Sequence, residues 1–132
     1  NMPEEWEPIK RAGHPDVKGF ASEERRLLVH VPLSSKPPKE WRDRFVGLYA
    51  EAREADRDRP LPEVSGSAIV IRPLDEELPD WIQMIDARID EANAFHLASA
   101  IPEQQRKEAS ERDAEQKLRD RLDDARRKAE EL

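Results

Sequence analysis

Two short apolar runs, each closed by a proline and followed by a helical pattern, constrain the fold of this chain more than any other feature. The runs are Leu27–Val31 and Ala68–Arg72, and their length and β-branched residues are typical of buried strands. Pro32 and Pro73 end them. Because each strand precedes a helix, the chain predicts two consecutive βα units and therefore an α/β or α+β fold.

The two helices are predicted from the spacing of their apolar residues. The first extends from about Pro38 to Ala55 and the second from about Pro79 to Ser99. Trp41 and Trp81 lie on the apolar faces, where core packing is a simpler role than lining a ligand pocket. The proline and tryptophan positions that the two units share fit either an internal repeat or convergent turn chemistry.

The predicted α/β domain, residues 26–99, is flanked by two segments of different composition. Residues 2–25 are rich in proline and glycine, which predicts a loop-rich arm in which either of two short extended stretches, Glu7–Arg11 or Pro15–Phe20, can supply an edge strand. Residues 102–132 form the second segment. From Glu103 onward it has no glycine, proline or aromatic residue, and it carries ten acidic and nine basic side chains. This composition predicts a solvated, charged helical tail.

Charged pairs can stabilise the tail helix without a buried face. Six acids each precede a base by four residues, and each pair contributes roughly 0.2–0.5 kcal/mol to an isolated helix. An apolar seam covers about two heptads, which is short for a stable coiled coil. The seam is Leu118, Leu122, Ala125, Ala129 and Leu132. The pairs are Glu103 with Lys107, Glu108 with Arg112, Asp113 with Lys117, Glu115 with Arg119, Asp123 with Arg127 and Asp124 with Lys128.

The size of the predicted domain suggests self-association. A single core below roughly 70–80 residues is only marginally stable, and this chain has no cysteine from which a disulfide could form. Two strands joined by a right-handed βαβ crossover are expected to be parallel, and their outer edges would be unpaired. We therefore predict a small two-layer sandwich of βαβα units that forms a homodimer.

Composition also narrows the chemistry. Without cysteine the chain has no thiolate nucleophile and no sulfur-ligated metal. A net charge of −7 makes binding to nucleic acid unlikely on electrostatic grounds. No apolar window approaches the roughly 18 residues of a membrane span, so we expect no membrane segment and a cytoplasmic protein. The four glycines form no nucleotide-binding loop, and we predict neither a cofactor nor a bound metal.

Four residues form a candidate ligand or interface site. His30 lies in the first strand on the side opposite the main core face, where a structural role is the simpler expectation. Arg72, Asp75 and Glu76 follow the second strand. Open α/β sheets bind ligands beyond the carboxyl ends of their strands, which would bring these four residues together. The acids have a simpler explanation too, because carboxylates at a helix N-terminus stabilise the helix dipole.

Other polar and aromatic residues have individual expectations. His14 is expected in a surface turn, and His96 at the C-terminus of the second helix, where a protonated imidazole complements the dipole. Trp6 is a candidate anchor for a partner. Asp86, Arg88 and Asp90 lie on the polar side of the second helix and can form an ionic contact with another element or subunit, although a solvated face is the simpler expectation.

These observations support two main functional hypotheses. The first is a non-enzymatic protein-interaction or scaffolding module, homodimeric, whose charged tail contacts a protein partner. The alternative is a small-ligand-binding protein or an enzyme whose site lies at the carboxyl ends of the strands or at the dimer interface. A third hypothesis, a nucleic-acid accessory protein, has the least support because 30 acidic residues outnumber 23 basic ones.

Overall fold

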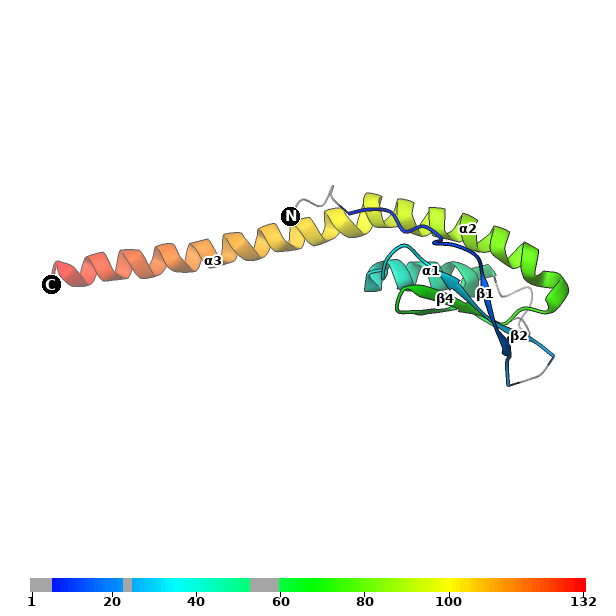
Figure 1. The fold of residues 1–132 in the computed structure, drawn as a ribbon. Coiled ribbons are helices and arrows are strands. Elements are labelled where there is room, and N and C mark those ends of the chain that lie inside the picture. Colours follow the sequence, from blue (N-terminus) through cyan, green and yellow to red (C-terminus); the bar gives the residue numbers. More distant parts are fainter. Residues whose placement is uncertain (1–5, 23–24, 53–59) are drawn as a thin grey trace. The chain divides into compact units, whose positions relative to one another are not determined.

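The computed structural model describes residues 6–22, 25–52 and 60–132 of the chain (Figure 1). These residues belong to two compact units, residues 1–97 and residues 98–132. The first unit contains a four-stranded antiparallel sheet with helices, and the second is helical. The mixed α/β fold class predicted from the sequence is therefore confirmed.

The sheet is built from two hairpins. Strand β1 (Asp16–Phe20) pairs with β2 (Leu27–Pro32), and β3 (Glu63–Ser65) pairs with β4 (Ala68–Ile71). Strands β2 and β4 pair with each other at the centre, so the order is β1-β2-β4-β3 and all neighbours are antiparallel. The N-terminal arm thus supplies the edge strand β1, and the short strand β3 forms the other edge.

The prediction that the two central strands are parallel is wrong. Val29 of β2 lies opposite Ile71 of β4, and Val31 lies opposite Ile69, so the strands run in opposite directions. The reason is β3, a strand that was not predicted from the sequence. After the first helix the chain returns as β3 at the far edge, and the hairpin then places β4 between β2 and β3. Strands β2 and β3 do run in the same direction, but they are not neighbours.

Two glycines shape the hairpins. Ser65 and Ala68 pair across a two-residue loop, and Gly66 at its first position has a φ of 58°. This geometry fits a type II′ turn, which favours glycine because its first central residue has a positive φ. In β1 the register shifts between Val17 and Gly19, and the φ of Gly19 is 146°. Such a bulge bends an edge strand and hinders the addition of another strand.

Helices α1 (Lys39–Ala52) and α2 (Leu78–Phe95) form the second layer, on one face of the sheet (Figure 1). The end predicted for the first helix, Ala55, lies outside the described residues. A 3-10 turn, η3 (Asp75–Glu77), precedes α2. The second helix was predicted to continue to Ser99, but after Phe95 the chain forms a π-helical segment, η4 (His96–Ala100).

The core of the first unit lies between the sheet and the two helices. Alternate residues of the central strands are buried on one side of the sheet, and they form a single cluster with apolar residues of α1 and α2. Trp41 and Trp81 both belong to this cluster and are fully buried, as expected. The central strand residues of the cluster are Val29, Val31, Ile69 and Ile71.

A chain of aromatic rings joins α1 to α2 within this core. Trp41 stacks on Phe45 with ring centroids 5.2 Å apart, and Phe45 contacts Tyr49 at 5.3 Å. Tyr49 then stacks on Trp81 of α2 at 5.8 Å. Such pairs contribute about 0.5–1.5 kcal/mol each beyond the burial of their area. The rings therefore fix how the two helices pack on each other.

Asn93 of α2 connects the N-terminal arm to both helices. Its side chain is buried, and its Oδ1 accepts hydrogen bonds from the Ile9 backbone N–H at 3.0 Å and from Trp41 Nε1 at 2.8 Å. Its Nδ2 donates to the Ile9 carbonyl oxygen at 2.9 Å. One amide side chain thus satisfies three buried polar groups, one on α1 and two on the arm. Because buried polar groups without partners are costly, this contact constrains where the arm can lie.

Arg11 makes a second link between the arm and α2. Its Nε donates to Asp86 Oδ1 at 2.6 Å and its NH2 donates to Oδ2 at 3.1 Å. The planar guanidinium matches both carboxylate oxygens, and this hydrogen bonding raises the pKa of Arg11. Nearby, the Ser34 backbone N–H donates to the Lys10 carbonyl oxygen at 2.7 Å. The expected ionic contact of Asp86 with another element is therefore observed.

The second unit contains α3 (Ile101–Glu130). Pro102 lies in its first turn, where a missing N–H leaves no intrahelical hydrogen bond unmade. The ion pairs of α3 are spaced three residues apart, not four as predicted. They are Glu103 with Arg106, Asp123 with Arg126 and Asp124 with Arg127. Across the described residues no helix is long and apolar enough to span a membrane.

Replacing Asn93 by alanine tests the role of its side-chain amide. Asn93→Ala leaves three buried polar groups of Ile9 and Trp41 without their partner. An unsatisfied buried group costs about 1–3 kcal/mol, so we expect the free energy of unfolding to fall by about 2–5 kcal/mol. Urea unfolding followed by tryptophan fluorescence measures this change.

The control is Gln83→Ala, which removes an exposed amide from the same helix. Its effect should stay within about 0.5 kcal/mol, as for most surface substitutions. Equal effects of Asn93→Ala and Gln83→Ala would show that the buried amide does not hold the arm.

Candidate functional site

His30 and Arg72 lie on the face of the sheet away from the helices, but different partners surround them. His30 is half-buried in the middle of β2, opposite Val70 of β4. Arg72 follows β4, and its NH1 donates to Glu63 Oε1 at 2.8 Å. Because β2 and β4 are antiparallel, their carboxyl ends lie at opposite ends of the sheet. The geometric reason for expecting one shared site at these ends therefore does not apply.

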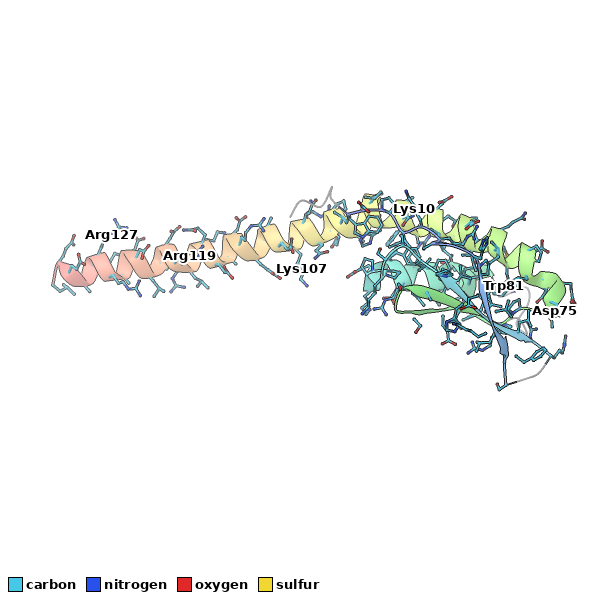
Figure 2. All side chains as sticks on the ribbon, in the orientation of Figure 1. Lys10, Asp75, Trp81, Lys107, Arg119 and Arg127 are labelled. Carbon is cyan, nitrogen blue, oxygen red and sulfur yellow. The ribbon has the colours of Figure 1, made fainter. Side chains whose placement is uncertain are left out.

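Asp75 and Glu76 are exposed in η3, the turn that opens the second helix (Figure 2). Glu77 in the same turn accepts a hydrogen bond from the Leu74 backbone N–H at 2.9 Å, and Arg26 lies 3.6 Å from its carboxylate. This arrangement is that of a helix start stabilised by acids. Over the part of the chain that the structure describes, no cluster of three or more His, Asp or Glu side chains is placed to hold a metal ion.

His96 differs from its expected role. The sequence pattern predicted a protonated imidazole at a helix end, but His96 is only 5% exposed and begins η4. Burial lowers its pKa, and the charge of Glu40 opposes this shift only in part. The neutral imidazole is therefore favoured. His14, in contrast, is exposed, as expected.

Trp6 is not an exposed anchor. It packs against the core cluster, and its ring lies 4.5 Å from the ring of His96, centroid to centroid, at an angle of 46°. Together with the contacts of Ile9 and Arg11, this contact holds the N-terminal arm against α2 and the start of η4. Because Trp6 and His96 cover each other, we assign both to the stability of the first unit and not to binding.

Asn93 is a structural residue that was not predicted from the sequence. Its signal was nevertheless present, because Trp81, Ile85, Ile89 and Asn93 follow one another at intervals of four and so lie on one face of α2. A polar side chain on an otherwise apolar face needs a buried partner. Asn93 has such partners, which is why its role here is structural.

The surface that stands out for binding is the apolar line on α3, called here the α3 seam. Leu118 and Leu122 are 59% and 54% exposed. Ala125 and Ala129 continue the line and are exposed as well, while Leu132 lies two residues beyond the end of the helix. No residue of α3 is buried. An apolar line of this kind can dock against a second helix.

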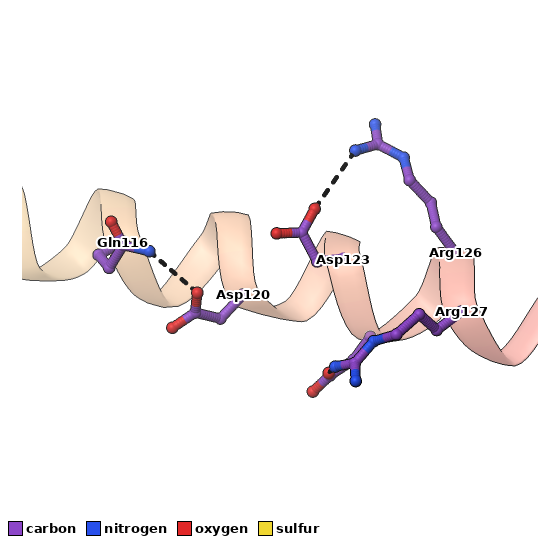
Figure 3. A network of polar contacts seen from close by, with 6 residues as sticks. Gln116, Asp120, Asp123, Arg126 and Arg127 are labelled. Carbon is purple, nitrogen blue, oxygen red and sulfur yellow. Dashed lines mark hydrogen bonds and ion pairs between the residues drawn. The ribbon is translucent and has the colours of Figure 1, made fainter.

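Polar side chains on the rest of α3 contact one another (Figure 3). Gln116 Nε2 donates to Asp120 Oδ1 at 2.9 Å, and Arg126 NH1 lies 3.7 Å from Asp123 Oδ1. Figure 2 shows side chains, among them Arg119, extending outward along the whole helix. These contacts are exposed and contribute little to stability individually. Through them, Asp120 and Asp123 contact side chains of the same helix.

The buried His96 predicts a pH dependence of stability. Because burial lowers its pKa in the folded state, the unfolded chain binds a proton first as the pH falls below about 6.5. Stability should therefore decrease from pH 7.5 to pH 5, with a slope from this group of at most about 1.4 kcal/mol per pH unit. His96→Phe should weaken this dependence, whereas His14→Phe, at an exposed position, should not. Urea unfolding at several pH values measures it, and an unchanged slope in His96→Phe would contradict the assignment.

Comparison with known proteins supplies no relative from which a function could be transferred. The chain matches no family model, no curated protein and no solved structure. The features that bear on function are therefore those of the chain itself: the α3 seam, the exposed edge of β1 and the open face of the sheet.

Proposed function

We propose that this protein is a non-enzymatic protein-interaction module in which α3 binds a helix of a partner. The observation that carries the proposal is the exposed α3 seam, with Leu118 and Leu122 both more than half exposed on a helix that has no buried residue. The proposal includes a cytoplasmic location, with which the absence of cysteine is compatible.

The physical argument is the cost of this exposure. Full burial of a leucine side chain contributes about 1.5–3 kcal/mol to the free energy of folding or binding. A helix that stays in solvent on all sides would need no leucines in one line. Leu118, Leu122, Ala125 and Ala129 are spaced by four, three and four residues, so they form one continuous stripe. A helical partner can bury this stripe.

Serine substitutions in the seam test this function in the full chain. Leu118→Ser combined with Leu122→Ser should reduce recovery of a specific partner by about tenfold or more in affinity capture from the source cells, because the apolar contact is lost. Asp113→Ser combined with Asp120→Ser, on the opposite side of α3, is the matched control. Circular dichroism should show that both variants stay helical. An identical set of captured proteins for the wild type and the leucine variant would contradict the proposal.

A homodimer formed by the first unit is a second proposal, and the edge strand β1 supports it. Val17 and Phe20 are 49% and 66% exposed, although they lie in register with Val29 and Leu27 of the central strand β2. Exposed apolar side chains beside a sheet edge are typical of interfaces. A second copy could cover them.

Light scattering of the full chain tests the homodimer. We expect twice the mass of one chain for the wild type and a monomer for Phe20→Glu, because a buried unpaired charge opposes the contact. Lys18→Glu in the same strand is the control and should remain dimeric. A wild-type chain that is monomeric at all concentrations would contradict the homodimer.

A further inference from the structure

The charges beside the α3 seam are all of one sign. In a coiled coil, the residues next to the apolar line determine which helices can pair. On α3 these positions hold Arg119 and Arg126 on one side of the seam, and Arg121 and Lys128 on the other. We call these four residues the basic flank. All four are exposed, and no acid interrupts the row on either side.

A second copy of this helix fits the basic flank poorly. In a parallel pair, Arg121 of one helix would face Arg126 of the other. In an antiparallel pair, each side of the seam would face the same side of the other copy, so arginine and lysine would again meet arginine and lysine. Like charges at these positions destabilise the pair in both orientations.

Most of the basic flank also forms no ion pair within α3. The structure describes every residue of α3. Among the ion pairs of this helix, only the pair of Arg126 with Asp123, at 3.7 Å, involves the basic flank. Arg119 donates instead to the neutral Gln116 Oε1 at 3.0 Å. The positive charges of the flank are therefore available to an approaching partner.

We propose that the α3 seam pairs with a helix of a different protein, one whose leucines are flanked by glutamate or aspartate. This inference rests on the interaction role proposed above and specifies the partner's chemistry. The leucines supply apolar burial, and the opposite charges at the flanking positions select a partner over a second copy.

Other charged partners fit α3 less well. Its remaining surface carries carboxylates, among them Asp120, Asp123 and Asp124, which would repel an anionic lipid surface or a nucleic acid. The segment from Glu103 to the end has no tryptophan, tyrosine or phenylalanine, the residues that anchor interfacial helices. A helix with flanking acids meets the basic flank directly and leaves these carboxylates on the outside.

The experiment uses the full chain and two designed helical peptides. Both peptides carry leucine at the seam positions; one has glutamate at all flanking positions and the other has lysine. Because a seam of two heptads binds weakly, NMR chemical-shift titration is the measurement. We expect the glutamate peptide to bind about tenfold more tightly or better, a ratio that corresponds to about 1.4 kcal/mol, with shifts confined to α3.

A pair of charge reversals provides the matched control. Arg121→Glu with Lys128→Glu changes the basic flank and should abolish or invert the preference between the peptides. Lys117→Glu with Arg127→Glu changes the net charge equally but lies off the flank, so the preference should remain. Circular dichroism checks that each variant keeps its helix.

The outcomes separate this inference from the proposed function. Equal binding of both peptides, or binding of neither, would overturn the choice of an acidic partner. The interaction role itself would still stand if partner capture depended on Leu118 and Leu122. The choice of an acidic partner would also be overturned if the wild type self-associated and Leu118→Ser abolished this self-association. Stronger binding to phosphatidylserine vesicles or to duplex DNA than to the glutamate peptide would overturn the same choice.

Discussion

The buried amide of Asn93 is the contact on which the arrangement of the first unit depends. It hydrogen-bonds both backbone polar groups of Ile9 and the indole N–H of Trp41, so it connects the arm, α1 and α2 at one point. Apolar contacts alone tolerate sliding, because the hydrophobic effect is non-directional. Hydrogen bonds to a buried amide do not tolerate it, because any shift leaves a buried polar group unsatisfied. Arg11 and Asp86 repeat the connection nearer the surface.

Fixing the arm also determines the edge of the sheet. The residues after Ile9 lead into β1, so the contact with α2 positions the strand that covers the outer side of β2. The opposite edge is the three-residue strand β3. A bulged strand and a very short one are poor templates for further pairing, which limits uncontrolled association. The sheet edges therefore give less reason for a dimer than the sequence suggested, and the case for one now depends on the exposed side chains of Val17 and Phe20.

The second unit follows a different principle from the first. In the α/β unit the apolar residues are buried against one another, whereas in α3 they form a line that nothing within the helix covers. The charges beside the seam also differ from those of the outer side. Acids and bases both occupy the outer side, whereas only bases, Arg119, Arg121, Arg126 and Lys128, border the seam. Specificity between helices arises from such flanking charges more than from the apolar contact, because leucines pair with any leucines.

The sequence by itself determined the local elements: both central strands, both packed helices, the charged tail helix and the burial of Trp41 and Trp81. These follow from periodicity and proline placement, which act over a few residues. Only the tertiary structure decided that the central strands are antiparallel, that Arg72 pairs with Glu63, and that Asn93 holds the arm. Each of these outcomes depends on contacts between residues distant in the chain. A local pattern cannot specify them, because the same strand can pair with either neighbour and in either direction.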